Sequence, residues 1–175
     1  MLRGFPIRLA LASFNHHSNI YRALVVNPGF EIAHDTTRIY ARNLEVPSGG
    51  GVGTARAIVH AYSVFATGGR ELQLRQATSD ALSAPAVPPM RSCFDECVRG
   101  QVQFSLGFMK PSRMWSFGSK SSFGSPGSGG SLGFADPEAG IGYAYVTCQL
   151  GTALAGDPRD LAIRDAVYSV ISPSA

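Results

Sequence analysis

The sequence predicts an α+β fold: part of a helical subdomain, then antiparallel strands and a C-terminal helix. Apolar residues first recur at the three-and-four spacing of a buried helix face, and later alternate as in strands. Glycine and proline are frequent, at 20 and 11 of 175 residues, which favours many turns over a helix bundle. A chain of this length can form one domain with a core, or a large part of a bigger domain.

The clearest predicted helix begins after Thr54, a residue type that caps helix N-termini. The glycine pair 68–69 ends it. A shorter helix is expected from Ser18 to the Asn-Pro-Gly turn at 27–29. The expected buried face of the longer helix consists of Ala55, Ile58, Val59, Tyr62 and Phe65.

Alternation predicts three strands. Phe104, Leu106 and Phe108 alternate with polar or small residues, as in one half-buried strand. Two more strands should flank the turn 136–140, where Gly140 suits a left-handed position. The second of them is apolar on both faces, so we expect it to be covered on both. The carboxylates of the turn are expected in solvent: Asp136 and Glu138.

The last predicted helix starts at Asp157-Pro158, because a capping residue followed by proline is typical of a helix start. A hairpin followed by a helix on its sheet is an α+β arrangement. The expected apolar stripe of this helix consists of Ala162, Ile163, Ala166, Val167, Val170 and Ile171.

Composition argues against several functional classes. The formal charge is only +3 and the arginines are scattered, so no nucleic-acid surface is expected. No cofactor is expected. No metal site is expected either, because Cys93 and Cys97 have the wrong spacing for zinc and Cys148 lies far from them in the sequence. Free thiols favour a reducing, cytoplasmic setting. Residues 1–17 form a poorly defined, weakly signal-like segment, and no run approaches the roughly 20 apolar residues of a membrane span.

Two segments together resemble a known family. They are residues 50–57, with the helix that follows, and residues 123–138, which read Phe-Gly-Ser-Pro-Gly-Ser-Gly-Gly-Ser-Leu-Gly-Phe-Ala-Asp-Pro-Glu. Both are similar to the esterase branch of the β-lactamase-related serine hydrolases, a group that includes class C β-lactamases, penicillin-binding proteins and carboxylesterases. The resemblance implies that residues 18–175 are the C-terminal part of such a domain, an incomplete β-lactamase/transpeptidase-like fold.

The third motif of these enzymes, a Lys-Thr-Gly or His-x-Gly strand that forms one wall of the site, can be aligned here. Ser125-Pro126-Gly127 falls at its position, inside a stretch with the serine and glycine content of a linker. The resemblance implies that the backbone N–H of Ser128 is an oxyanion donor. Ser125 departs from the pattern, because it carries neither the cation nor the imidazole.

The other two motifs are absent. No Ser-x-x-Lys exists in the chain and no tyrosine precedes an asparagine by two positions, although a serine needs a neighbouring base to act as a nucleophile. In the family these motifs lie upstream of the matched region. We therefore expect a truncated, split or inactive form of an acyl-serine hydrolase of small esters or amides. The alternative is a non-catalytic binding protein that uses the remaining fold.

Ser131 lies in a Gly-x-Ser-x-Gly sequence, which resembles a nucleophile elbow. A true elbow lies between a strand and a helix, whereas Ser131 precedes a predicted hairpin, so close strand packing is the favoured interpretation. An active hydrolase that uses Ser131 or Ser125 is the third hypothesis. The histidines that could serve as its base are His16, His17, His34 and His60.

The predicted strand after Gly140 should have an unpaired edge, because strands from the missing part of the family fold would lie beside it. An open edge is a template for another chain. We therefore expect a dimer, a partner chain that completes the sheet, or an aggregation-prone fold.

Overall fold

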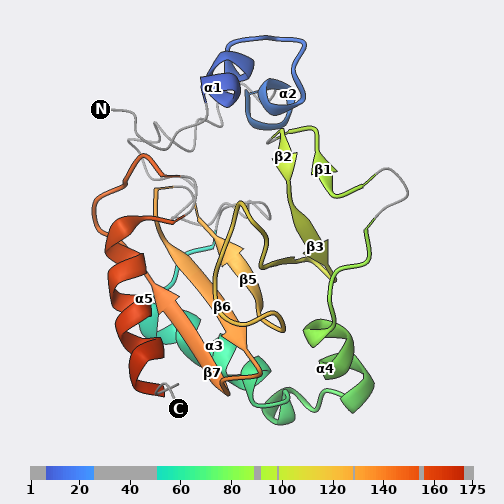
Figure 1. The fold of residues 1–175 in the computed structure, drawn as a ribbon, viewed down its shortest axis with the longest axis vertical. Helices are drawn as coiled ribbons and strands as arrows, with labels where there is room; N and C mark the ends of the chain where they lie inside the picture. The colour runs from blue at the N-terminus through green and yellow to red at the C-terminus, as the bar shows by residue number, and fades with distance from the viewer. Residues whose placement is uncertain are drawn as a thin grey trace.

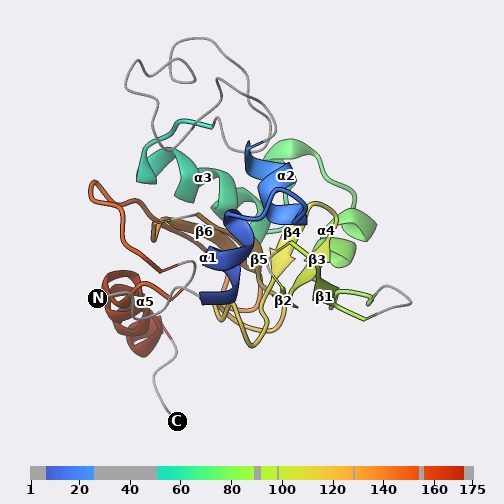
Figure 2. The same cartoon turned by 90° about the horizontal axis from the view of Figure 1, so that it is seen from above.

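The structure of the chain, a computed structural model, describes residues 7–25, 51–88, 92–97, 99–127, 129–153 and 156–171. Within them a five-stranded antiparallel sheet, in the order β3-β4-β5-β6-β7, lies between helix α3 on one face and helix α5 on the other (Figures 1 and 2). The predicted α+β class is confirmed. The elements are β3 (Gln103–Ser105), β4 (Phe108–Lys110), β5 (Phe123–Pro126), β6 (Leu132–Asp136), β7 (Ile141–Tyr145), α3 (Ala55–Ala66) and α5 (Pro158–Ile171).

Smaller elements come before this sheet along the chain. The helix predicted from Ser18 is present as α2, and the Ser18 hydroxyl accepts a hydrogen bond from the Tyr21 N–H at 3.1 Å. Helix α1 lies inside the segment 1–17, for which the sequence predicts no defined element. No helix in the described ranges is both long and apolar enough to cross a membrane. The smaller elements are α1 (Ile7–Ser13), α2 (Asn19–Val25), η3 (Arg70–Leu72), α4 (Gln76–Ser83), β1 (Phe94–Asp95) and β2 (Gly100–Gln101).

Helix α3 packs closely on β6 and β7 because glycines face it. Thr54 caps the helix as predicted, and its hydroxyl accepts a hydrogen bond from the Ala57 N–H at 3.2 Å. A Cβ atom added at Gly142 on β7 would lie 2.3 Å from the Ser63 backbone nitrogen and 2.7 Å from the Val59 carbonyl oxygen. Of the predicted face, Ala55 is exposed and the other four residues are half-buried: Ile58, Val59, Tyr62 and Phe65.

Strand β6 is buried along its whole length and alternates large and small side chains. Leu132 and Phe134 belong to the apolar cluster beneath α5, whereas Ala135 belongs to the cluster beneath α3. The neighbouring β7 is covered on both faces, as predicted, with Tyr143 on the α5 side and Gly142 on the α3 side. The cluster beneath α5 also contains Trp115 and Phe117, with Val167 and Tyr168 packed against it. The cluster beneath α3 also contains Phe123, with Tyr62, Phe65 and Phe108 packed against it.

The single strand predicted at 104–108 is wrong. The chain turns back on itself there, so that β3 and β4 form a hairpin with Phe104 opposite Met109. Leu106 and Gly107 both have positive φ, 50° and 84°, as in a two-residue type I′ turn. Phe104 and Leu106 are 50% and 61% exposed. The alternating apolar residues therefore lie on both sides of a turn, and the alternation does not predict which of them are buried.

The apolar stripe predicted for α5 is wrong as well. Its buried face carries Asp160 and Arg164, which are 2% and 5% exposed, together with the half-buried Val167 and Tyr168. Hydrogen bonds between α5 residues and Tyr143, Asp136 and the Ser116 carbonyl oxygen hold the helix with this face toward the sheet. The exposed members of the predicted stripe are Ala162, Ile163, Ala166, Val170 and Ile171.

Asp136 is fully buried, so the expectation that it is a solvated turn residue is wrong. Its carboxylate accepts hydrogen bonds from the Ser119 N–H at 2.8 Å, the Ser119 hydroxyl at 2.6 Å and the Tyr168 hydroxyl at 2.5 Å. The N–H groups of Glu138 and Ala139 also donate to it. Burial raises the pKa of Asp136, but these hydrogen bonds outweigh burial and hold the pKa below its ordinary value. Glu138 is exposed, as predicted.

We expect Gly142→Ala to lower the free energy of unfolding by about 1–3 kcal/mol, because the new methyl group must push α3 away from β7. Gly51→Ala is the matched control. Nothing lies within 4 Å of a Cβ added at Gly51, so its effect should stay within about 0.5 kcal/mol. Urea denaturation followed by circular dichroism measures both. Equal effects of the two substitutions would contradict the close packing.

We expect Asp136→Asn to lower stability at neutral pH by an amount that shrinks in acid. A folded-state pKa below the ordinary 3.8 stabilises the fold above that pH, and this stabilisation is lost as the pH falls through the folded pKa. The difference in free energy of unfolding between the wild type and the variant should therefore be largest near neutrality and fall below about pH 4. Urea titrations over this pH range test it, and a constant difference would argue against a role for the charge.

Candidate functional site

The end of β5 and the turn into β6 form the candidate site, since they carry the third-motif residues. Ser125 and Pro126 pair with β6, and the Gly127 N–H donates a hydrogen bond to the Ser131 carbonyl oxygen at 2.6 Å. The described residues of this segment therefore form a paired strand and the two sides of a turn in spite of its linker-like composition. Ser128, the predicted oxyanion donor, lies outside the described residues.

Two glycines allow this turn to pack closely, Gly130 against the start of α5 and Gly129 against the segment before α5. Gly130 has φ 112°, and a Cβ there would lie 2.5 Å from an Asp157 carboxylate oxygen. Gly129 has φ 91°, and its carbonyl oxygen accepts a hydrogen bond from the Gly151 N–H at 2.7 Å. Any larger residue at either position would be strained and would also collide. The glycine-rich sequence thus joins the motif turn to the capping residue of the last helix.

Ser125, which the sequence resemblance aligns with the family's cation or imidazole, has an exposed side chain. Its hydroxyl contacts the carbonyl oxygen of the next residue, Pro126, at 3.4 Å, which is long for a hydrogen bond between oxygens. Within the described residues, no lysine, histidine or tyrosine side chain bonds to it. Ser125 therefore supplies neither charge nor an activated oxygen in this geometry.

Ser131 stands at the start of β6 and is followed by strand, turn and strand. This geometry matches the favoured structural interpretation and lacks the helix of a nucleophile elbow. Its hydroxyl accepts a hydrogen bond from the Thr147 N–H at 3.4 Å. As with Ser125, no histidine, lysine or tyrosine side chain in the described ranges bonds to it. Ser131 joins β6 to the segment after β7.

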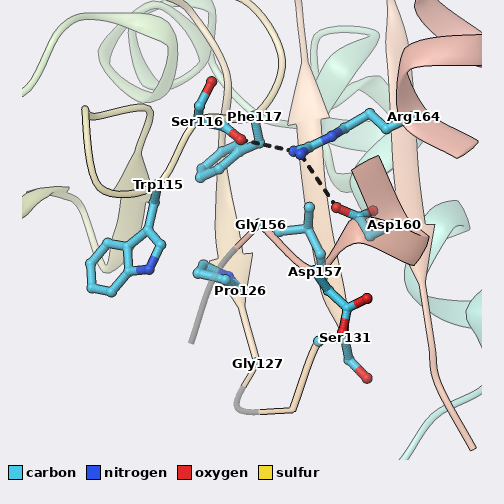
Figure 3. Close-up of a pocket in the computed structure, with 12 residues that line it drawn as sticks. Trp115, Ser116, Phe117, Pro126, Gly127, Ser131, Gly156, Asp157, Asp160 and Arg164 are labelled. Carbon is cyan, nitrogen blue, oxygen red and sulfur yellow. Dashed lines mark hydrogen bonds and ion pairs between the residues drawn. The ribbon is translucent and has the colours of Figure 1, made fainter. Parts of the chain in front are cut away.

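A small pocket lies beside this turn, on the α5 side of the sheet (Figure 3). Its cavity volume is about 20 Å³, which is room for one water molecule and far less than an acyl substrate needs. Trp115 lines it, and the buried indole Nε1 has no hydrogen-bond partner in the described part of the chain. The other lining residues include Phe117, Pro126, Gly127, Ser131, Asp160 and Arg164.

A buried polar network forms the wall of this pocket under α5. The Arg164 guanidinium donates a hydrogen bond to the Ser116 carbonyl oxygen at 2.9 Å and forms an ion pair with Asp160, with 3.3 Å between nitrogen and oxygen (Figure 3). Asp160 also accepts a hydrogen bond from the Tyr143 hydroxyl at 2.9 Å. Burial and the neighbouring Asp160 raise the pKa of Tyr143 above its ordinary value, so this phenol stays protonated near neutrality and cannot act as a base.

Asp157 caps α5, as the sequence predicts. Its carboxylate accepts hydrogen bonds from the Arg159 backbone N–H at 2.9 Å and from the Arg159 guanidinium at 2.7 Å. These bonds lower the pKa of Asp157 to about 2. Arg159 also donates to the Gln149 carbonyl oxygen at 2.9 Å. Asp157 is therefore a charged structural residue at the pocket edge, with no proton to donate at neutral pH.

Other candidate groups lie away from this turn. His60 is exposed and pairs with Glu71 at 3.8 Å, as expected for a surface residue. Lys110 is buried on the α3 side, where it donates to the Leu82 carbonyl oxygen and lies 5.0 Å from the Phe123 ring centroid. Burial lowers the pKa of Lys110. His34 lies outside the described residues. Neither His60 nor Lys110 therefore supplies the cation that Ser125 lacks.

Metal ligands and disulfides were not predicted from the sequence. In the described part of the chain no group of three or more His, Cys, Asp or Glu side chains is arranged to hold a metal. The three cysteines are unpaired, with Cys93 and Cys97 partly buried and Cys148 exposed.

Sequence reasoning missed the network of Asp160 and Arg164. One signal was available: the two residues are spaced i,i+4, which places them on the same face of a helix. Trp115 gave no such signal, because it lies in a loop far from α5 in the sequence.

We expect Arg164→Ala to lower the free energy of unfolding by about 3–5 kcal/mol, since it leaves the Asp160 carboxylate buried and unpaired. The double variant Arg164→Met with Asp160→Asn removes both charges and should recover part of the loss. Urea denaturation of both variants tests this. If the double variant is no more stable than Arg164→Ala, the unpaired charge of Asp160 is not the cause of the lost stability.

The chain is similar to several β-lactamase-like proteins. It is 30% identical over 102 residues to the esterase/β-lactamase LipL of Mycobacterium tuberculosis, a match that covers 58% of this chain and 23% of LipL. A penicillin-binding protein homologue from Caulobacter crescentus superimposes with a TM-score of 0.56 at 32% identity, covering 67% of this chain and 32% of that one. No protein-family profile matches.

Two further solved structures are similar to this chain. A family VIII carboxylesterase has a TM-score of 0.56 at 26% identity and covers 66% of this chain and 31% of its own. EstA from Arthrobacter nitroguajacolicus Rue61a has a TM-score of 0.53 at 28% identity, with 67% and 32% covered. The chain thus spans about a third of the length of these solved relatives and 23% of LipL. It is related to the β-lactamase-like esterases and penicillin-binding proteins and shares part of their fold.

Proposed function

We propose that this chain keeps the sheet that forms one wall of the acyl-transfer site in the β-lactamase-related serine hydrolases, and that it does not hydrolyse esters or amides by itself. The proposal depends on one observation: neither Ser125 nor Ser131 has a base within hydrogen-bonding distance in the described residues. A serine hydroxyl is a poor nucleophile until a neighbouring group takes its proton.

The contacts of the two serines support this proposal in different ways. The Ser131 hydroxyl accepts a hydrogen bond from the Thr147 backbone N–H at 3.4 Å. This bond connects the start of β6 to the segment after β7, which is a structural role. Ser125 is exposed and could contact a substrate. The hydrogen-bond partner of its hydroxyl is the Pro126 carbonyl oxygen, and an amide oxygen is too weak a base to deprotonate a serine. Either residue would need a base from elsewhere.

The pocket supports the same conclusion. Its volume of about 20 Å³ is too small for an acyl group, and the ionic side chains in its lining are already paired. The Arg164 guanidinium bonds Asp160 and the Ser116 carbonyl oxygen, so it has no role as an anion receptor. The substrate class of a complete site would be a small ester or amide, because relatives carry the names esterase, β-lactamase and carboxylesterase.

A non-catalytic binding role is the alternative. The edge of β7 favours it, because the sheet order of the described residues ends there. A free strand edge is a binding surface that needs no catalytic residue. In this alternative the β5 turn is a structural feature of the sheet.

We expect the purified chain to show no steady-state turnover of nitrophenyl butyrate or of a chromogenic cephalosporin. We also expect no adduct with a fluorophosphonate probe by intact mass, since acylation by an unactivated serine is slow. LipL serves as the positive control in the same assays. Turnover that survives extensive purification and disappears in Ser131→Ala or Ser125→Ala would refute the proposal and identify the nucleophile.

A further inference from the structure

Trp115 carries a buried hydrogen-bond donor that the described protein groups leave unused. The side chain is 5% exposed, and its indole Nε1 is buried without a hydrogen-bond partner among the described residues. An indole nitrogen can only donate, and burying such a group costs free energy unless an acceptor pairs with it. Buried polar groups of native proteins find their partners in the protein or in ordered water. The burial of Trp115 therefore indicates an acceptor next to its indole nitrogen.

The small pocket beside the turn into β6 is where that acceptor fits. Trp115 lines the pocket together with Pro126, and Figure 3 shows the indole nitrogen on the edge of the ring that faces Pro126. The pocket volume is about 20 Å³. One water needs roughly 10–15 Å³ on this measure, and two would need about twice that. The pocket thus has the size of a site for a single water.

The lining also offers the further partners that a bound water requires, since an internal water makes about three hydrogen bonds. The Ser131 hydroxyl accepts a backbone N–H, and its own proton has no acceptor among the described residues. Each carboxylate oxygen of Asp160 has one protein partner, and a carboxylate oxygen can accept two hydrogen bonds. The pocket therefore combines two unused donors, Trp115 and Ser131, with unused acceptor capacity on Asp160. Water matches this set because it both accepts and donates.

The charge of the lining favours a neutral ligand over an ion. Asp160 is paired with Arg164, and Asp157 is paired with Arg159, so these groups leave no unpaired charge for a bound ion to neutralise. Cavities that stay dry are apolar, whereas this one is lined by a hydroxyl, two carboxylates and a guanidinium.

We propose that this pocket binds one water molecule, which accepts a hydrogen bond from the Trp115 indole and links it to Ser131 and Asp160. The water connects three segments that are distant in the sequence: the loop before β5, the start of β6 and helix α5. The site needs no catalytic group, so the proposal is independent of whether the chain hydrolyses esters.

Nuclear magnetic resonance of the ¹⁵N-labelled full chain tests the proposal. Trp115 is the single tryptophan of the sequence, so the spectrum contains one indole N–H signal. We expect a cross-peak between this proton and water, with opposite signs in laboratory-frame and rotating-frame Overhauser spectra. Opposite signs identify a bound water, whereas proton exchange with solvent gives the same sign in both spectra.

Ser131→Ala removes one partner of the water and keeps the indole. It should shift the indole N–H resonance and weaken or abolish the cross-peak, because the water loses one of its hydrogen bonds. The matched control is Ser125→Ala, an exposed serine on β5, which should change neither signal. Circular dichroism should show that both variants are folded.

Three outcomes would overturn the proposal. One is a wild-type indole proton without a cross-peak to water. Another is a scalar coupling across a hydrogen bond from the indole nitrogen to a carbonyl carbon, because it would identify a protein acceptor in place of water. The third is a cross-peak that Ser131→Ala leaves as intact as Ser125→Ala does.

Discussion

The complete burial of β6 between two helices is the constraint on which the rest of the structure depends. Every residue of Leu132–Asp136 is buried, so each of its faces must match the element that covers it. On the α3 side the strand presents Gly133 and Ala135, and a Cβ at Gly133 would lie 2.6 Å from the Tyr62 ring. On the α5 side it presents Leu132 and Phe134. The small face lets α3 approach closely, and the large face fills the space beneath α5.

Helix α5 is held by polar contacts where an apolar stripe was expected. Tyr168 bonds the buried Asp136, and Asp160 bonds Tyr143 and Arg164. A buried charge is costly unless it is paired and hydrogen-bonded, so these partners specify one orientation of the helix. The same orientation leaves Ile163 and Val170 in solvent. The exposed flank of α5 is thus a consequence of the buried network on its opposite face.

The candidate site has a well-formed strand and turn, but the described side chains bring neither a base nor a cation to its serines. Ser125 lies on a properly paired strand, and the turn after it is held by the Gly127 N–H and by contacts of Gly130 with Asp157. The relatives share this part of the fold over about two thirds of the present chain, but the matched part is about a third of their own length. Strand geometry depends on glycine and on sheet pairing, whereas catalysis also needs a charged or basic group near the serine.

Local features of the sequence determined the element types. Thr54 and Asp157 specify helix starts through their own side chains, and the turn 136–140 depends on the left-handed Gly140. The motif strand was also predictable, because its sequence resembles a known family over many residues. In each case the interacting groups are near one another in the chain.

Only the tertiary structure decided which side chains are buried. Asp136 reads as a turn carboxylate, yet Ser119 and Tyr168, distant in sequence, supply its hydrogen bonds. Periodicity placed Ile163 in a buried stripe, but in the structure Arg164 is buried with its partners and Ile163 is exposed. Phe104 and Leu106 alternate like a strand, but a left-handed turn separates β3 from β4 at Leu106 and both side chains are exposed. Polarity patterns record average preferences, whereas burial depends on partners that lie far apart in the chain.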